Sequence, residues 1–117
     1  MQGLGELESA VMNVLWRDDR DRTVRDVLDE LAPERELAYT TIMTVLDNLH
    51  RKEWVERTKV SRAFHYRATM TRAEAAARAL RAVLESTGDP EGVLLHFAQS
   101  ATDEEASVLR KALRKRK

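Results

Sequence analysis

The 117-residue sequence contains no cysteine, little glycine or proline, and few aromatic side chains. The absence of cysteine excludes disulfide bonds, thiolate catalysis and every cysteine-based metal site. Four glycines and two prolines leave little material for loops, and 34% charged residues indicate a helix-rich protein with solvated surfaces. Because aromatic residues make up only 5% of the chain, aliphatic side chains must build most of the core.

The sequence also lacks long apolar runs. A membrane-spanning helix needs about 18 or more consecutive apolar residues, which occur nowhere in the chain. The opening stretch MQGLGELESA has neither the basic nor the apolar region of a signal peptide. We therefore expect a cytoplasmic protein, and a chain of this length holds one compact core and a short appendage rather than two full domains.

Net charge is zero, but the charges are unevenly distributed. Residues 1–36 contain 5 arginines and 10 acidic residues, a net charge of −5. Residues 48–67 contain six basic and two acidic residues, a net charge of +4, and residues 110–117 contain six basic residues and no acidic one. Because the local distribution of charge matters more than its sum, the neutral total does not exclude a nucleic-acid partner.

Apolar spacing predicts two helices in the first third of the chain. Leucines and valines at helical spacing favour an amphipathic helix over residues 5–17. The run RDDRDR, at residues 17–22, is predicted to be a solvated connection. Thr23 and Asp26 form a capping-box pattern that opens a second helix, and Pro33 ends it because the residue before a proline avoids helical angles.

A third helix and a hairpin are predicted next. The helix lies near residues 38–52, and its inward aliphatic face consists of Ala38, Ile42, Val45, Leu46 and Leu49. Residues 54–60 and 63–68 alternate apolar and polar side chains around a polar tip at positions 61–62, which is typical of two antiparallel strands. Three helices followed by a hairpin predict a mostly α winged helix-turn-helix domain over residues 1–69, with a small β-hairpin wing.

The sequence beyond position 69 predicts three further helices. Thr71 caps the first, Pro90 suits the first turn of the second, and Thr102 with Glu105 forms a capping box for the third. The first of these helices has a small apolar face made of Ala73, Ala76, Ala77, Leu80 and Leu84. The three helices are too short for an independent core, so their apolar stripes need a partner. Residues 70–117 are therefore predicted to form a dimerisation segment through Leu80, Leu84, Val93, Leu94, Phe97, Leu109 and Leu113.

The outward face of the third helix carries residue types that read DNA. The side chains that point away from the aliphatic face, or flank it, are Thr40, Thr41, Thr44, Asp47, Asn48 and Arg51. Threonine hydroxyls contact phosphates or bases, the threonine methyl meets the thymine methyl, and asparagine pairs with adenine through two hydrogen bonds. The alternative is that threonines near a helix start are simply caps on a solvated surface.

The predicted hairpin adds positive charge to this surface. Arg57, Lys59 and Arg62 are predicted at or near its tip, where a wing would lie along the DNA backbone. Phosphate contacts of this kind supply much of the affinity and make it salt-dependent. The alternative is a charged edge strand that resists aggregation. The third helix and the hairpin together favour DNA binding more than either does alone.

Four stretches within residues 4–68 resemble one known family: LGELESAVMNVLW, TVRDVLDEL, LAYTTIMTVLDNLHRK and VERTKVSRAFHYRA. They are similar to the BlaI/MecI family of penicillinase repressors. The resemblance implies a homodimer that binds a palindromic operator and represses β-lactamase or related genes. It also implies a membrane-bound sensor protease as a partner, through which the repressor is inactivated. Residues that match the family's operator-contacting helix and wing are Tyr39, Thr40, Thr41, Thr44 and Arg62.

Two positions depart from the family pattern. The inactivating cut falls in a region that resembles residues 95–98, but His96 precedes Phe97 where staphylococcal members have asparagine, so the use of this cleavage region is left open. Glu53 stands where many relatives have glycine, and glutamate costs about 1 kcal/mol there if the backbone is left-handed. A copper-sensing branch uses C-terminal cysteines, which this chain lacks. Its three histidines are scattered, so we predict no metal and no cofactor.

Other functions compete with this interpretation. The same fold could serve a MarR- or PadR-like regulator that binds a small effector between its domains, although no cluster of polar residues marks an effector pocket. It could also serve protein–protein contacts alone. An enzyme is the least favoured class, because the sequence has no nucleophile–base pair, no glycine-rich phosphate loop and no clustered metal ligands.

Overall fold

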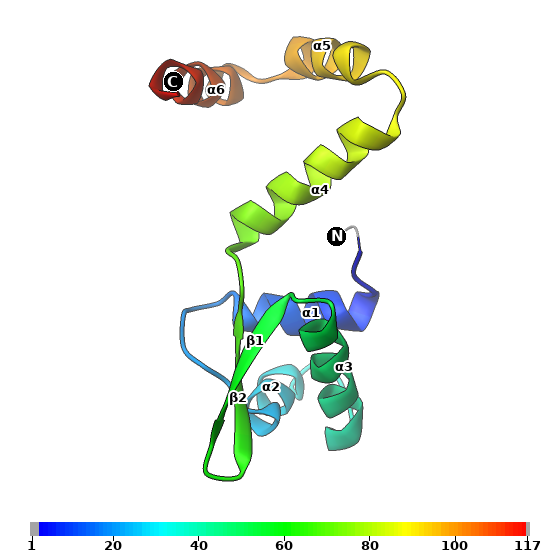
Figure 1. Ribbon diagram of the computed structural model, residues 1–117, viewed down its shortest axis with the longest axis vertical. Helices are drawn as coiled ribbons and strands as arrows, with labels where there is room; N and C mark the ends of the chain where they lie inside the picture. The colour runs from blue at the N-terminus through cyan, green and yellow to red at the C-terminus, as the bar shows by residue number, and fades with distance from the viewer. Residues whose placement is uncertain (1–2, 117) are drawn as a thin grey trace. The chain divides into compact units, whose positions relative to one another are not determined.

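In a computed structural model that describes residues 3–116, the chain forms six helices and one two-stranded hairpin (Figure 1). The first half contains α1 (Glu6–Leu15), α2 (Val24–Leu31), α3 (Tyr39–Arg51), β1 (Val55–Val60) and β2 (Ala63–Ala68). The second half contains α4 (Arg72–Ser86), α5 (Pro90–Ser100) and α6 (Asp103–Lys115). The chain divides into two compact units, one up to Ala79 and one from Leu80 onward. The predicted order of helices and strands is confirmed.

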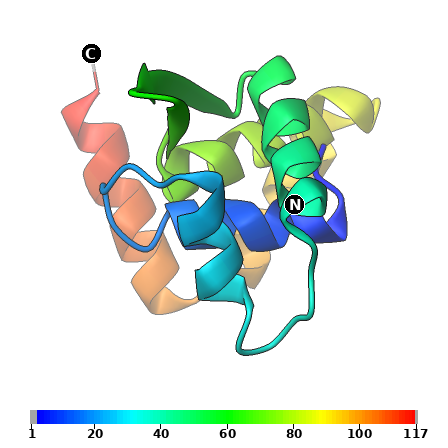
Figure 2. The same cartoon turned by 90° about the horizontal axis from the view of Figure 1, so that it is seen from below.

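One hydrophobic core holds the first unit together. The helices α1, α2 and α3 pack against one another in pairs, and Figure 2 shows them crossing (blue, cyan and teal). The buried side chains come from all three helices and both strands: Val11, Met12, Val14, Leu15, Val24, Val27, Leu28, Leu31, Ile42, Val45, Leu46, Leu49, Val55 and Tyr66. Burying aliphatic stripes of this kind is the main force that folds such a domain.

One residue of the predicted inward face of α3 lies outside the core. Ala38 is exposed, because it is the N-cap residue with an extended backbone (φ −79°, ψ 148°) and precedes the first helical turn. The remaining four predicted residues are buried. The error therefore concerns the helix boundary and not the orientation of the helix.

Reciprocal hydrogen bonds open several helices as the sequence predicts. The Thr23 hydroxyl accepts from the Asp26 N–H at 3.1 Å, and the Asp26 carboxylate accepts from the Thr23 N–H at 3.0 Å. The same exchange opens α4 and α6. Each exchange satisfies backbone N–H groups that a helix start otherwise leaves free.

The two strands pair in antiparallel register from Val55 with Ala68 to Val60 with Ala63. The predicted tip is confirmed at positions 61–62. Arg57 does not lie at this tip, because it pairs with Tyr66 in the middle of the ladder. Of the three basic residues predicted at the tip, Lys59 and Arg62 are the two that lie near it.

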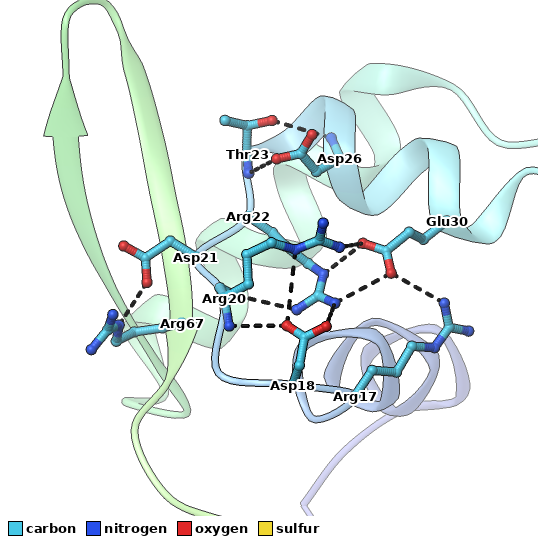
Figure 3. Close-up of polar contacts among 9 residues, drawn as sticks. All are labelled: Arg17, Asp18, Arg20, Asp21, Arg22, Thr23, Asp26, Glu30 and Arg67. Atoms are coloured by element: carbon cyan, nitrogen blue, oxygen red, sulfur yellow. Dashed lines mark hydrogen bonds and ion pairs between the residues drawn. The ribbon is translucent and has the colours of Figure 1, made fainter.

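The connection between α1 and α2 differs from the solvated loop that its charges predict. Arg22 is fully buried, and its backbone exchanges hydrogen bonds of 2.9 and 2.7 Å with Tyr66, which adds an isolated β-bridge to the hairpin. Figure 3 shows how the buried guanidinium is compensated: it donates to the carboxylates of Glu30 and Asp18. An arginine is rarely buried in this way unless it is paired.

The start of α4 belongs to the first unit and is oriented by α1. Arg72 donates to the Asn13 side chain at 2.8 Å and lies 5.2 Å from the Trp16 ring centre. With this rotation Ala75 is buried, whereas Ala73 and Ala77 of the predicted small face are exposed. Contacts with Asn13 and Trp16, which the local sequence does not reveal, set this rotation. The small face stays a prediction for contact with a partner.

The unit from Leu80 onward exposes its apolar side chains. Among residues 80–116 none is buried in the single chain. The residues predicted for dimerisation are exposed at Leu80, Leu94, Phe97, Leu109 and Leu113, and partly exposed at Leu84 and Val93. No helix in the described part of the chain is both long and apolar enough to cross a membrane.

Candidate nucleic-acid interface

The polar face of α3 is open to solvent from its first turn. Thr40, Thr41 and Thr44 are exposed, as is Arg51 at the last turn, and Asn48 is partly exposed. The aliphatic residues on the opposite side are buried. The helix therefore presents hydroxyl, amide and guanidinium groups along one side while its other side holds it in the core.

The start of α3 carries no side-chain cap. Its N-cap residue is Ala38, whose methyl group makes no hydrogen bond to the first-turn N–H groups. Thr40 and Thr41 follow the cap, so the alternative that these threonines serve as caps does not describe this helix. First-turn N–H groups without a side-chain partner are a favourable position for a phosphate oxygen.

Two exposed apolar side chains extend the same surface. Tyr39, which the sequence selected, is 42% exposed and its ring lies 5.2 Å below the Arg25 guanidinium carbon. Met43, which the sequence did not select, is 39% exposed one turn from Thr40 and Asp47. Its position next to the polar face on a helical wheel is the sequence signal that identifies it. An exposed apolar side chain on a groove-facing helix suits the thymine methyl group.

The hairpin carries its positive charge around one aromatic ring. The Lys59 nitrogen lies 5.6 Å and the Arg57 guanidinium carbon 4.2 Å from the ring centre of Phe64, which is 37% exposed. Both distances lie within the range of cation–π attraction. Arg62, at the tip, is exposed. The hairpin therefore offers Lys59 and Arg62 to solvent and holds Arg57 closer to the protein.

Arg57 is directed toward α3. Its Nη1 atom lies 3.0 Å from Oδ1 of Asp47, and the two side chains are 27% and 47% exposed. Burial raises the pKa of the neighbouring Tyr66 phenol above its ordinary value, although the Arg57 guanidinium acts in the opposite direction. Tyr66 therefore stays neutral at physiological pH, and Arg57 has Asp47 as its acidic partner.

The base of the hairpin is fixed by a second set of charges (Figure 3). Arg22, which the β-bridge joins to β2, is paired with Glu30 of α2. Burial raises the pKa of Glu30, but the hydrogen bonds and charges of Arg22, Arg17 and Arg20 together lower it by more, so the pKa lies below its ordinary value. On β2, Arg67 donates to Asp21 at 2.7 Å. Sequence reasoning missed Arg22, since the local run of charges resembles a surface loop.

No metal site accompanies these charges in the described residues. Across positions 3–116, no group of three or more histidine or acidic side chains could hold a metal ion.

The structure has three packed helices, of which the third exposes a polar face, and a basic hairpin directly after them. This arrangement defines the winged helix-turn-helix class. Solved structures of transcription regulators share this fold. Streptococcus pneumoniae FabT in complex with DNA aligns with a TM-score of 0.51 and 22% identity, covering 97% of this chain and 73% of that one. MepR, a regulator of the Staphylococcus aureus multidrug efflux pump MepA, aligns with a TM-score of 0.51 and 16% identity over 97% and 77%.

Sequence comparison defines the family more narrowly. The penicillinase repressor family matches residues 4–115. The transcriptional regulator BlaI of Mycobacterium tuberculosis is 40% identical over 113 residues, which cover 94% of this chain and 82% of that protein. An uncharacterised 16.5 kDa protein of Latilactobacillus sakei is 32% identical over 78 residues, covering 67% and 53%. The chain belongs to the penicillinase repressor family and is a DNA-binding transcriptional repressor, which confirms the resemblance seen in the sequence.

Proposed function

We propose that this repressor binds a palindromic operator as a homodimer, with α3 in the major groove and the hairpin along the phosphate backbone. The observation that carries the proposal is the solvent-exposed face of α3, where Thr40, Thr41 and Thr44 stand opposite fully buried aliphatic residues. A recognition helix needs this arrangement, because one side must anchor it while the other enters the groove.

The residues of this surface have different roles in the proposal. Threonines and Asn48 face base edges, where hydroxyl, methyl and amide groups distinguish base pairs. Tyr39 and Arg51, at the two ends of α3, contact the sugar–phosphate backbone, which fixes the register. Lys59 and Arg62 contact phosphates from the hairpin, and these contacts make the affinity salt-dependent.

The dimer is proposed from the exposed apolar residues of the second unit. Leu80, Leu94 and Phe97 are 64%, 53% and 52% exposed in the single chain. A second copy of the same helices offers a matching surface, as symmetric dimers do. Dimerisation also compensates for the weak DNA binding of a single module, which buries only about 600–1,000 Å² on DNA. Linking two modules raises the avidity about 10²–10⁴-fold.

We also propose that repression of β-lactamase or related genes is relieved in the manner the family resemblance implies. The bond region at His96 and Phe97 lies inside α5, and both side chains are exposed. A membrane-bound sensor protease is the proposed partner, and the helix must open locally before its backbone can be cut. A regulator with this role acts in the cytoplasm and needs no catalytic group of its own.

The proposed interface is tested by two alanine variants and two controls. Binding of a labelled duplex from the region upstream of the protein's own gene is measured by mobility shift at several salt concentrations. T44A is expected to weaken binding about tenfold, since one base contact contributes about 1–3 kcal/mol. R62A is expected to reduce the slope of log affinity against log salt by about 1.8, because each subunit of the proposed dimer loses one phosphate contact.

Thr87→Ala and Arg78→Ala, at exposed positions outside this surface, serve as matched controls and should bind like the wild type. If T44A and R62A keep the wild-type affinity and the wild-type salt slope, α3 and the hairpin do not form the DNA interface.

A further inference from the structure

The ion pair between Asp47 and Arg57 joins the two surfaces that the proposed function assigns to DNA. Asp47 lies on the outward side of α3, one helical turn from both Thr44 and Arg51. Arg57 lies in the middle of β1 and reaches across to it, with 3.0 Å between Nη1 and Oδ1. This ion pair connects a side chain of α3 with a side chain of the hairpin.

Asp47 poses an electrostatic problem for DNA binding. Its carboxylate lies between threonine and arginine positions on a surface that must approach phosphates, and it is 47% exposed. A negative charge facing the DNA backbone opposes association, because like charges across an interface lower the affinity. A guanidinium at hydrogen-bond distance cancels this charge and fixes the carboxylate in place.

Arg57 is itself held on more than one side. Its guanidinium lies 4.2 Å from the centre of the Phe64 ring, which meets Tyr66 edge-on at 6.3 Å between ring centres. Tyr66 is 1% exposed and is joined through its backbone to Arg22. Arg57 would have to leave both the carboxylate and the ring to reach a phosphate.

We propose that Arg57 is a positioning residue: it neutralises Asp47 and holds that carboxylate in place, and it does not contact DNA. This inference rests on the proposed function, and it replaces the direct phosphate contact that the sequence suggested for Arg57. Lys59 and Arg62 then supply the phosphate contacts of the hairpin, as their exposure allows. The planar guanidinium suits this role, because it can pair with a carboxylate and stack on a ring at the same time.

A double-mutant cycle tests the assignment. R57Q, D47N and the double variant R57Q/D47N are compared with the wild type on a duplex selected by the wild-type protein from a random pool. R57Q is expected to weaken binding about tenfold, because the uncovered carboxylate repels the DNA. D47N is expected to bind within about twofold of the wild type, and the double variant within about threefold, with the wild-type salt slope retained.

Lys59→Gln provides the matched control for a direct contact. It should weaken binding with a salt slope lower by about 1.8, because both subunits lose a contact, and adding D47N should not rescue it. Thermal melting of each variant in the absence of DNA separates folding from binding. If R57Q does not fold, R57K is measured instead. Lysine keeps the positive charge but loses the planar guanidinium that pairs with the carboxylate and stacks on the ring. The DNA affinity of R57K should therefore lie between those of the wild type and K59Q.

The inference is overturned if the double variant binds as weakly as R57Q with a salt slope lower by about 1.8, since Arg57 of each subunit would then contact a phosphate itself. It is also overturned if R57Q binds like the wild type. Wild-type protein that selects no duplex would contradict the proposed function instead, so the two failures can be told apart.

Discussion

Glu53 carries the clearest local strain in the first unit. Its backbone has φ 67°, in the left-handed region, directly after the C-cap residue of α3. A side chain with a Cβ atom is disfavoured there relative to glycine. The family resemblance seen in the sequence pointed to this position on the condition that its backbone is left-handed, and the structure fulfils that condition.

Replacing Glu53 with glycine should therefore stabilise the protein by about 1 kcal/mol. The free energy of unfolding from urea titration measures the effect. E53A is the matched control, because it removes the carboxylate while keeping the Cβ atom, and it should leave stability near the wild-type value. Equal stabilisation by both variants would show that side-chain charge, and not backbone strain, is the cause.

At the scale of elements, the hairpin depends on a buried charge at its base. Arg22 and Arg20 both lie within salt-bridge distance of Glu30, but their side chains are 1% and 65% exposed. Removing one partner of a buried pair leaves an uncompensated charge, whereas an exposed pair contributes little. Because both arginines pair with Glu30, replacing each in turn compares a buried and an exposed ion pair to the same carboxylate.

R22A should destabilise the protein by more than about 2 kcal/mol, because it removes a fully buried side chain and its ion pairs, while Glu30 keeps Arg17 and Arg20 as partners. R20A should cost less than about 1 kcal/mol. Urea unfolding gives both values under the same conditions. Similar small losses for the two variants would mean that the buried pair does not anchor the hairpin.

The elements that sequence reasoning predicted well are those with local causes. Helical periodicity, capping pairs such as Thr23 with Asp26, and strand alternation each act over a few residues, and they give the order and approximate bounds of the helices and the hairpin. The solvated connection predicted for residues 17–22 is wrong at Arg22, whereas residues 17–20 are exposed. The burial of Arg22 depends on Tyr66, far along the chain, and on a glutamate in the next helix.

The candidate site was predictable from the sequence where it depends on local spacing, and not where it depends on packing between elements. The wheel position of Thr44 and its neighbours follows from the aliphatic stripe of α3 alone. The partner of Arg57 does not, since an ion pair between a helix and a strand depends on how the two elements pack. Met43 was overlooked because residue type was given more weight than its position on the wheel.

The whole molecule combines a folded DNA-binding unit with helices whose apolar residues are exposed in the described part of the chain. The first 36 residues carry a net charge of −5, while the segment around the end of α3 and the hairpin carries +4. This separation directs one side of the first unit toward DNA, because the field near the surface depends on local charge. In the proposed homodimer, the exposed side chains of α5 and α6 contact a second copy of the chain.

Hydroxyl-radical footprinting of the purified protein on a selected duplex tests this account most directly. We predict two protected half-sites related by a dyad, with centres about 10 bp or a near multiple apart. Phe97→Asp should lose protection of both half-sites at the concentration that saturates the wild type, because dimer avidity is worth about 10²–10⁴-fold. A single protected half-site, or full protection that persists in both F97D and T44A, would contradict the account.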